Sequence, residues 1–501
     1  MLPANSTNVG SLISSSGHLM LGGDLTVAGN LTLTDTDLDV ALGYNGTNAG
    51  VDKHIRADTI VLSGGTLNIN DAAVDATKLV GNQTLSFTVM ETVNGLTGQF
   101  ANLKWLNSLF VLDQDTGDGK NLLVHLSYAD TTPFSRYGIN HNTREVTRVL
   151  NWGMQNEPGL IQGLVGLTDA EIRGEIDRMR GSEMAADSLK LSFWKPWKYA
   201  FRQAGVRQGN SPALSHRTNA LASGAGESGT TRGWVNVLGS KTDVSSDGNA
   251  RKYEVERRGM VLGVDHALND RTILGAQLAY LDHELDGKRG RRIDSQDISV
   301  GMYASTIPVE GFRADAYLGY GWQDHDYRRT DLMGRHDADY DGKSLYASVQ
   351  VSKPIGMRPG FTISPIVGLD YQRAKNKGFT EKGTSGNQRI ESADHDLLTA
   401  RIGISAQAQT EKARWNARLD YGHHLGGKNR PEITSRFVGS PGSPSMKLYG
   451  VETGRDYVEA GVGFEVFLDA KKKVSLFGDY DYHHASREKV HSGRIGLSVK
   501  W

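Results

Sequence analysis

Arg494-Ile495-Gly496-Leu497-Ser498-Val499-Lys500-Trp501 is the stretch of sequence that decides the fold of this chain. Apolar side chains occupy every second position from Ile495 to Trp501, and polar or small residues fill the positions between them. A strand with one polar face and one apolar face that ends at an aromatic residue is typical of a membrane-spanning β-barrel. Any half-buried strand alternates in this way, so the barrel hypothesis requires further strands from the preceding residues.

Strand-like segments with one apolar face recur from Gly233 to Trp501. In the segment 312–323, Phe312, Leu318 and Trp322 belong to an apolar face, and segments 397–404, 413–422 and 458–466 repeat the pattern. Comparable segments occur near residues 234, 258, 273, 296, 312, 341, 361, 397, 413, 457, 474 and 491. The sequence therefore predicts about twelve strands, an even number as in bacterial barrels.

The second face of these segments carries charge. The charged residues on it are Arg313, Asp315, Arg401, Arg414, Arg418, Asp420, Glu459 and Glu465. A soluble sandwich would bury its apolar face, but aromatic residues also gather near the segment ends, as the interfacial girdles of a membrane barrel require. We interpret the charged residues as the lining of a barrel lumen. Contact with water in the lumen is enough to explain the presence of any single one of them.

The composition agrees with strands of which one face is polar. Of the 501 residues, 38% are hydrophobic, and no apolar run of about 18 residues indicates a membrane-spanning helix. The formal net charge of −1 gives no electrostatic case for binding nucleic acid. The chain contains no cysteine, which suits passage through an oxidising compartment. Residues 1–5 lack the features of a signal peptide, so a surface protein with this sequence is expected to be a processed or truncated form.

Residues 1–83 contain short apolar pairs separated by Gly, Asn and Asp. The clearest pairs recur at a spacing of six residues, namely Leu19 and Leu21, Leu25 and Val27, and Leu31 and Leu33. Such a series predicts the stacked rungs of a β-helix, and a sandwich of short strands is the alternative. Residues 84–155 carry larger apolar groups such as Phe100 and Trp105. We expect this segment to cap the open end of the stack.

A helix is predicted after Leu167. Thr168-Asp169-Ala170-Glu171 is a capping box, in which the Thr168 hydroxyl and the Glu171 carboxylate satisfy free backbone amides. Ile172, Ile176 and Met179 then mark one face at helical spacing, and residues 183–191 continue the helical composition. Residues 206–231 contain almost nothing to pack and are predicted to be a flexible linker. The helical linker thus covers residues 156–231, ahead of the barrel at 232–501.

Three motifs occur in the order found in one family of secreted proteins. Arg180-Gly181-Ser182-Glu183-Met184-Ala185-Ala186 is similar to a Leu-Ser-Gly-Glu-x-His-Ala block, although Arg180 and Ala185 depart from it. Gly378-Phe379-Thr380-Glu381 is similar to a stretch that follows a middle strand. The pattern of Gly496, Val499 and Trp501 resembles the signal that hands bacterial outer-membrane proteins to the barrel-assembly machinery. The chain resembles the classical monomeric (type Va) autotransporters, which carry a surface passenger and a barrel in one polypeptide.

The resemblance implies an all-β fold with a small helical linker. It comprises the C-terminal stub of a right-handed parallel β-helix passenger, an autochaperone-like cap, and a 12-stranded transmembrane antiparallel barrel whose pore a helix threads. The implied location is the bacterial outer membrane, with the passenger on the cell surface. The implied partners are outer-membrane lipid, the barrel-assembly machinery, periplasmic chaperones, and an unknown receptor or further copies of the passenger.

The sequence indicates a translocator with an adhesive or structural passenger rather than an enzyme. We find no Gly-x-Ser-x-Gly elbow, and adjacent histidines such as His483 and His484 point to opposite faces of a strand, so we expect no catalytic residue, cofactor or metal. Some family members cut themselves at an Asn-Asn pair in the pore helix. No Asn-Asn pair occurs between Thr168 and Arg232 of this chain. The alternatives are the translocator of a secreted hydrolase whose catalytic part is missing here, and a plain diffusion channel.

Overall fold

The computed structural model describes residues 7–45, 48–51, 54–72, 74–80, 83–208, 229–427, 430–440 and 442–501. The chain divides into two compact units. The first comprises residues 1–180 with 331–333 and 439–446, and the second comprises residues 181–330, 334–438 and 447–501. Each unit is described by itself. Among the described residues, no helix is both long and apolar enough to cross a membrane.

Two parallel sheets form the core of the first unit. One contains β1 (Thr7–Val9), β4 (Leu25–Thr34), β7 (Ile55–Ser63) and β9 (Leu85–Gln99), and the other contains β3 (His18–Met20), β5 (Asp37–Asn45), β8 (Thr66–Ala72) and β10 (Asn102–Lys104). Successive coils stack in register, because Leu25 pairs with Ile55 and Ile55 with Met90. These inward side chains are buried between the sheets. The predicted parallel architecture is confirmed.

The sequence suggested that the six-residue spacing separates successive rungs, but this prediction is wrong. Leu25, Val27, Leu31 and Leu33 all lie in the single strand β4. In a parallel stack the partner of a strand comes from the next coil, so the period is set by the length of a whole coil. Short strands β2 (Leu12–Ser15) and β6 (Asn48–Val51) add to the edges of β4 and β5.

An antiparallel hairpin and two helices follow the last coil. β12 (Asn121–Tyr128) pairs antiparallel with β9 and with β11 (Phe110–Asp115). Helix α1 (His141–Asn156), which the sequence reasoning missed, begins with a capping box between Asn140 and Thr143. Helix α2 (Asp169–Met179) begins at the Thr168 and Glu171 capping box, with reciprocal hydrogen bonds between the two residues. Short 3-10 turns are η1 (Ala76–Leu79), η2 (Pro133–Tyr137) and η3 (Pro158–Leu160).

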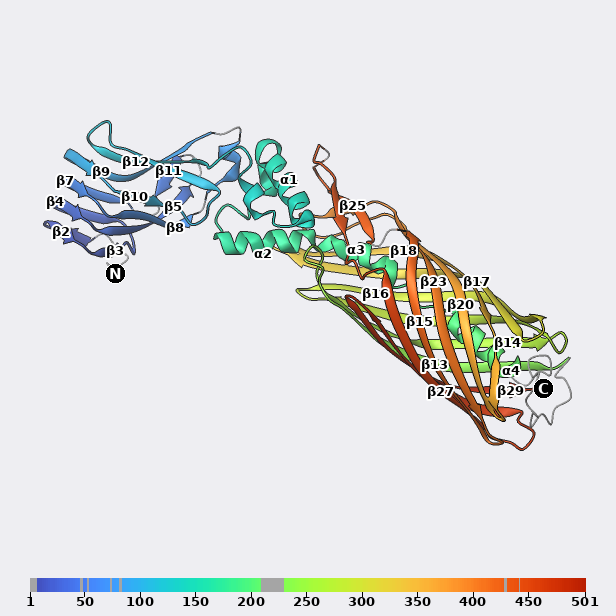
Figure 1. Ribbon diagram of the computed structural model, residues 1–501. Helices are drawn as coiled ribbons and strands as arrows, with labels where there is room; N and C mark the ends of the chain where they lie inside the picture. Colours follow the sequence, from blue (N-terminus) through green and yellow to red (C-terminus); the bar gives the residue numbers. More distant parts are fainter. Residues whose placement is uncertain are drawn as a thin grey trace. The chain divides into compact units, whose positions relative to one another are not determined.

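Twelve antiparallel strands close into a barrel in the second unit (Figure 1). They are β13 (Thr231–Val244), β14 (Tyr253–Ala267), β15 (Thr272–Gly287), β16 (Arg291–Val309), β17 (Phe312–Asp331), β18 (Gly334–Ser352), β20 (Phe361–Asn376), β23 (Ala393–Gln409), β24 (Ala413–Gly427), β27 (Asp456–Phe467), β28 (Val474–Ala485) and β29 (Glu488–Lys500). The ring closes where β13 pairs with β29, with Val235 opposite Leu497. Each of the twelve predicted segments lies in one of these strands, so the predicted fold class is confirmed.

Five short strands complete the barrel unit outside this ring. β19 (Ile355–Arg358) forms a hairpin extension with β20. A separate small sheet has the order β21 (Phe379–Thr380), β22 (Gln388–Ile390), β25 (Glu432–Phe437) and β26 (Met446–Tyr449).

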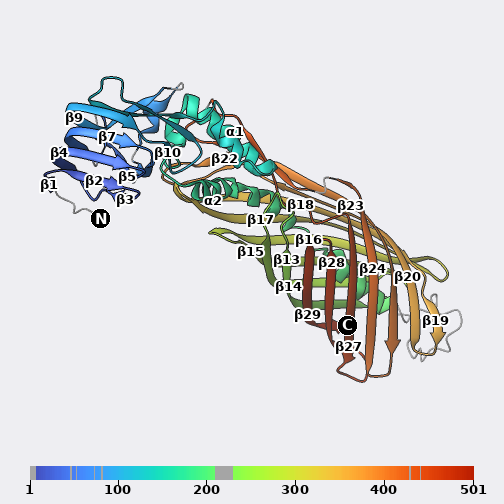
Figure 2. The ribbon, with the colours of Figure 1, turned by 60° about the vertical axis from the view of Figure 1, so that its left-hand side comes forward.

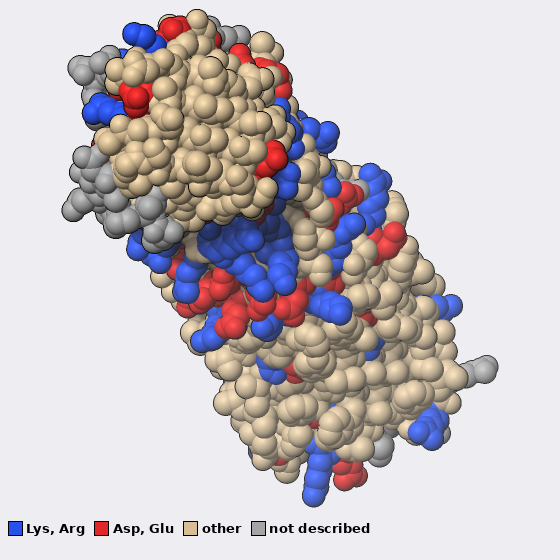
Figure 3. Space-filling model, turned by 90° about the vertical axis from the view of Figure 1, so that its left-hand side faces the viewer, with Lys and Arg blue, Asp and Glu red and all other residues tan. Residues whose placement is uncertain are grey.

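The two faces of the barrel wall have opposite chemistry. Outward positions carry apolar residues with half-exposed side chains, among them Leu318, Trp322, Val462 and Ile495. Inward positions of the same strands are buried and largely polar. Much of the barrel surface seen in Figure 3 carries neither basic nor acidic residues. This is the distribution that a strand requires when hydrocarbon surrounds it on one side only.

Inward aromatic rings pack directly over glycines of neighbouring strands. A Cβ added at Gly301 would lie 2.0 Å from the Tyr317 hydroxyl, and one at Gly263 would lie 2.1 Å from the Trp234 ring. Tyr303 covers Gly275 in the same way. The rings therefore occupy space that any larger residue at these glycines would fill.

We predict that Gly301→Val strongly reduces closure of the barrel. Overpacking of this kind costs about 1–3 kcal/mol or more, because the strand carrying Tyr317 is held by the closed sheet. The measurement is the fraction of detergent-refolded chain that migrates faster without boiling. Ala304→Val, which adds methyl groups near the outer face of the same strand, should leave that fraction unchanged. A folded fraction equal to that of wild type for Gly301→Val would contradict the packing argument. So would a folded fraction that does not rise when Tyr317→Ala is added to Gly301→Val.

A carboxylate at the start of α2 generates a pH-dependent prediction for the first unit. Asp169 Oδ1 accepts hydrogen bonds from the Tyr137 hydroxyl at 2.6 Å and the Ser108 amide at 2.8 Å. Burial alone would raise the pKa of Asp169, but these hydrogen bonds outweigh burial and hold the pKa below its usual value. The carboxylate therefore stabilises the fold above the unfolded-state pKa of about 4, and this stabilisation is lost as the pH falls through the folded-state pKa.

We expect Asp169→Asn to lower the free energy of unfolding of the first unit by about 1–3 kcal/mol at neutral pH, since a charged acceptor is lost. The difference from wild type should shrink as the pH falls below about 4. Urea unfolding of the full chain, with the Trp105 signal obtained as the difference in fluorescence from a matched Trp105→Phe chain, measures both quantities. Asp113→Asn, at an exposed position, is the control. A difference that is the same at pH 7 and pH 3 would show that the charge of Asp169 is unimportant.

Candidate functional site: the barrel lumen

A segment that follows the first unit runs through the lumen of the barrel. It contains η4 (Arg180–Glu183), α3 (Met184–Asp187), η5 (Ser188–Lys190) and α4 (Trp197–Gln208). Figures 1 and 2 both show α4 inside the ring of strands. Residues 206–208, which the sequence placed in a flexible linker, belong to this helix, and residues 209–228 lie outside the described part of the chain.

One side of the segment is held by apolar packing. Trp194, Trp197 and Phe201 are buried, together with Ala200 and Ala204. They pack in one cluster with wall residues of β13 to β18 and β28, namely Trp234, Leu238, Val261, Ala279, Leu281, Tyr303, Tyr317, Tyr346 and Phe477. Pro196 immediately precedes the first residue of α4, where a proline does not interrupt the helical hydrogen bonds. The segment thus has an apolar side that matches one part of the wall.

The other side of α4 is held by ion pairs. Lys195 Nζ lies 2.8 Å from Glu459, and Lys198 contacts both Glu459 and Asp481. One turn further on, the Arg202 guanidinium lies 2.8 Å from Asp479 and 2.8 Å from Asp481. Glu459 is 7% exposed, so its charge depends on these cations rather than on water.

Residues at the start of the segment are also fixed by buried polar contacts. Glu183 pairs with Arg291 at 3.2 Å, and the Ser182 hydroxyl donates to the Gln388 side chain at 2.7 Å. Asp187 accepts from the Val451 amide at 2.8 Å. Lys190 Nζ donates to the Val451 carbonyl at 2.6 Å. The contacts come from strand β16 and from two connections between strands, so this part of the segment is enclosed from several sides.

Lumen side chains also satisfy backbone carbonyls of the segment. The Leu191 carbonyl accepts from Arg257 at 2.9 Å, and the Ser192 carbonyl accepts from the Tyr346 hydroxyl at 2.8 Å. In α4 the carbonyls of Phe201 and Gln203 accept from Arg313 at 2.8 Å and Arg232 at 2.6 Å, respectively. Irregular backbone at membrane depth requires such partners, because hydrocarbon supplies none.

The eight charged residues that the sequence placed in the lumen all occupy inward positions of the strands. Six of them pair with one another within the wall, namely Arg313 with Asp315 at 2.7 Å, Arg414 with Glu465 at 3.0 Å, and Arg418 with Asp420. Arg401 pairs with Asp370 at 3.2 Å. Of the eight, Glu459 and Arg313 contact the threaded segment directly.

Further charged residues that hold the segment escaped the sequence reasoning. They include Arg232, Arg257, Arg291, Asp479 and Asp481. Asp479 and Asp481 alternate with outward Tyr480, so the same period-two pattern could have identified them. No sequence signal distinguishes residues that contact the segment from residues that pair within the wall.

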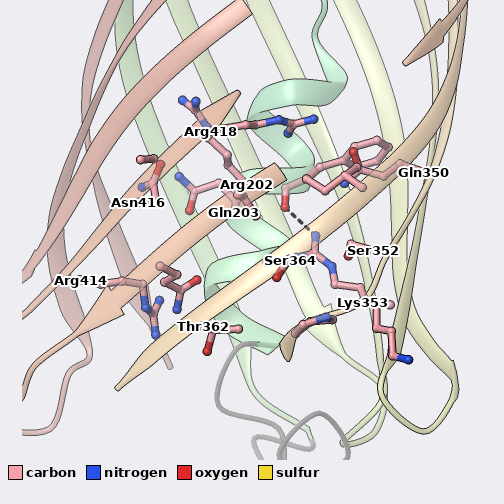
Figure 4. Close-up of a pocket in the computed structure, with 18 of the residues that line it drawn as sticks. Arg202, Gln203, Gln350, Ser352, Lys353, Thr362, Ser364, Arg414, Asn416 and Arg418 are labelled. Atoms are coloured by element: carbon pink, nitrogen blue, oxygen red, sulfur yellow. Dashed lines mark hydrogen bonds between the residues drawn. The ribbon is translucent and has the colours of Figure 1, made fainter. Parts of the chain in front are cut away.

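A cavity of about 820 Å³ remains beside the C-terminal half of α4 (Figure 4). Arg202 and Gln203 reach it from the helix. The polar residues of its wall include Gln350, Ser352, Lys353, Thr362, Ser364, Arg414, Asn416 and Arg418. The described part of the segment therefore fills the lumen incompletely. Within the described residues, no group of three or more His, Asp or Glu side chains could hold a metal ion.

The three residues of the predicted assembly signal lie in or directly after the strand that closes the barrel. Gly496 faces inward, where an added Cβ would lie 2.5 Å from the Phe477 ring. Val499 and Trp501 are on the exposed outer side. The backbone of Trp501 exchanges two hydrogen bonds with Thr231, at 2.9 and 3.0 Å.

Residues 233–481 match the family model described as the autotransporter β-domain. Outer membrane protein B of Rickettsia prowazekii is 20% identical over 320 residues, which cover 58% of this chain and 18% of that protein. An extracellular serine protease of Serratia marcescens is 22% identical over 531 residues, which cover 94% of this chain and 48% of that protein. The chain spans about half or less of the length of these relatives.

Solved structures with a similar fold include two autotransporter domains. The translocator domain of NalP from Neisseria meningitidis is 16% identical, covers 60% of this chain and 95% of its own, and has a TM-score of 0.46. The β-domain of the Bordetella autotransporter BrkA is 18% identical, covers 54% of this chain and 99% of its own, and has a TM-score of 0.41. The family match extends from β13 into β28 and so includes nearly the whole ring of strands. The chain therefore belongs to the autotransporter family, and its barrel is an outer-membrane β-domain.

Proposed function

We propose that the barrel exports and anchors its own N-terminal β-helix at the bacterial cell surface. The observation that carries this proposal is the threaded segment, which joins the first unit to the barrel through the lumen itself. A plain diffusion channel needs no such segment. The contacts of residues 182–203 with inward side chains on many strands support a chain retained in the pore after export.

The connections between strands support the direction of export. At the end of the barrel where Trp501 lies, the connections between strands are short turns, namely 268–271, 310–311, 353–360, 410–412 and 468–473. At the opposite end two connections are long, 377–392 and 428–455. Bacterial barrels have short periplasmic turns and longer extracellular loops. Gln388 and Val451, which hold the start of the segment, lie in the long connections, so the segment enters from the extracellular side.

We propose an adhesive or structural role for the passenger, which would cover residues 1–83 with a cap at 84–155, ahead of a linker at 156–231. The similarity to rickettsial outer membrane proteins supports this role. The alternative, a translocator for a hydrolase, draws on the similarity to the Serratia protease, of which this chain spans 48%. The proposed partners are outer-membrane lipid, periplasmic chaperones, the barrel-assembly machinery acting on Gly496, Val499 and Trp501, and a surface receptor or further passenger copies.

Deletion of residues 488–501 should abolish surface display, because it removes β29 and leaves the edges of β13 and β28 unpaired. The measurement is digestion of the passenger by protease added to intact Gram-negative cells that express the chain behind a signal peptide. Deletion of residues 2–15, at the other end of the chain, is a control of equal length and should keep the passenger accessible. The proposal would be overturned if the protease failed to digest the passenger of the wild-type chain. It would also be overturned if the protease digested the passenger of the chain that lacks β29.

Glu459→Gln should loosen the retained segment, because Lys195 and Lys198 lose the carboxylate that both contact. Breaking a buried ion pair costs about 3–5 kcal/mol, so we expect several-fold higher and less steady conductance in planar bilayers. Glu256→Gln removes the partner of Arg258 on the exposed face and should conduct like wild type. Both variants must first show the folded electrophoretic band. Wild-type conductance from folded Glu459→Gln would mean that these ion pairs do not hold the segment in place.

A further inference from the structure

Four lysines lie together at the periplasmic end of the barrel. This periplasmic lysine cluster consists of Lys412, Lys471, Lys472 and Lys473. The turn between β23 and β24 meets the end of β27, since the Phe467 amide donates to the Lys412 carbonyl at 2.9 Å. The turn between β27 and β28 meets the end of β29, since the Lys500 amide donates to the Lys473 carbonyl at 2.8 Å. Two neighbouring turns thus gather four cations.

The cluster lacks the internal counter-charges found elsewhere on the barrel. Lys412, Lys471 and Lys473 form no ion pair with any residue that the structure describes. The two acidic residues in the same turns are Glu411 and Asp469, and Asp469 accepts hydrogen bonds from the Lys471 and Val474 amides at 3.1 and 2.7 Å. Its carboxylate therefore stabilises the turn and does not pair with a lysine side chain.

Cations near the extracellular end are arranged differently. Several outward arginines and lysines there pair with carboxylates on the same or a neighbouring strand, as for Lys241 with Glu254, Arg258 with Glu256, Arg292 with Asp294, Arg328 with Asp337 and Arg373 with Asp394. Lys343 and Lys375, which lie opposite each other on β18 and β20, form no ion pair with any described residue. The periplasmic lysine cluster gathers a larger number of cations without a carboxylate partner among the described residues, and so offers a place for an anion from outside the chain.

Apolar side chains accompany the lysines. Leu468 is 56% exposed and Trp501 is 62% exposed, although both are large and apolar. Lys472 Nζ lies 5.1 Å from the centre of the Phe467 ring. Other periplasmic turns repeat the arrangement, with Lys353 at 5.0 Å from Phe312 and Arg358 at 5.6 Å from Phe361. Aromatic residues beside long cationic side chains are typical of the level at which lipid headgroups meet acyl chains.

We propose that the periplasmic lysine cluster binds the headgroup of an anionic phospholipid in the inner leaflet of the outer membrane. The phosphate and the net negative charge of the headgroup contact the lysines, and the acyl chains lie against Leu468, Trp501 and the outer face of β27 to β29. Electrostatic attraction to several lysines selects an anionic lipid over a zwitterionic one. The apolar neighbours favour a lipid over free phosphate. The proposal rests on the orientation of the barrel given under the proposed function, and it goes beyond export by naming the lipid that this end of the barrel binds.

The test uses the full chain refolded in detergent, with equal amounts of phosphatidylglycerol and phosphatidylethanolamine, and native mass spectrometry to count retained lipids. Wild type should retain phosphatidylglycerol with a preference on the order of tenfold. The variant Lys412→Gln, Lys471→Gln, Lys473→Gln should lose most of that preference. The matched control is Arg258→Gln, Arg292→Gln, Arg373→Gln, which removes the same charge from paired residues at the other end and should bind like wild type. Both variants are compared only after each shows the folded electrophoretic band.

Two results would overturn the proposal. One is a wild-type chain that retains both lipids equally, or a lysine variant that keeps the full preference. The other is an equal loss in the lysine variant and in the arginine control, which would assign the preference to net charge rather than to this cluster.

Discussion

The pairing of β13 with β29 is the interaction on which the rest of the barrel depends. Thirteen residue pairs, from Arg232 opposite Lys500 to Val244 opposite Glu488, join the first strand to the last. Hydrocarbon offers no partner to a free strand edge, so a membrane sheet must close on itself. Closure separates an outer face that contacts lipid from an inner face that does not, and the alternation of side chains along each strand then assigns every residue to one of the two.

A closed barrel creates a second constraint, because its lumen collects buried charge. Arg414 and Glu465, or Arg418 and Asp420, satisfy one another within the wall. Glu459, Asp479 and Asp481 receive cations from Lys195, Lys198 and Arg202 of the threaded segment, although Asp479 also pairs with Arg494 of the wall. The aromatic side of the same segment fits the wall that carries Tyr303 and Tyr317. The segment thus supplies counter-charges to part of the lumen, while the cavity beside α4 shows that its described residues do not fill the lumen sterically.

The period-two pattern predicted the barrel well because it is local and repeats in every strand. It identified all twelve strands and the inward face that carries Arg313 and Arg401. It could not show which inward residues meet the segment, since the partners lie far apart in sequence, as for Lys195 and Glu459. Helix α4 was obscured because Trp197, Tyr199 and Phe201 alternate like a strand after Pro196. Helix α1 was missed because its capping box uses Asn140 and Thr143 in place of the usual Ser or Thr and Glu.

The most direct test of this account is a cross-link between α4 and the wall, which the cysteine-free chain makes simple to design. A Cβ added at Gly205 would point at the Arg313 guanidinium, so Gly205→Cys with Arg313→Cys places two thiols across the lumen interface. A short bismaleimide applied to outer membranes should join them as efficiently as it joins Thr272→Cys with Thr306→Cys, two directly paired wall positions. Cross-linking of the wall pair without the α4 pair would show that the segment does not occupy the barrel, and the account of the lumen would fail.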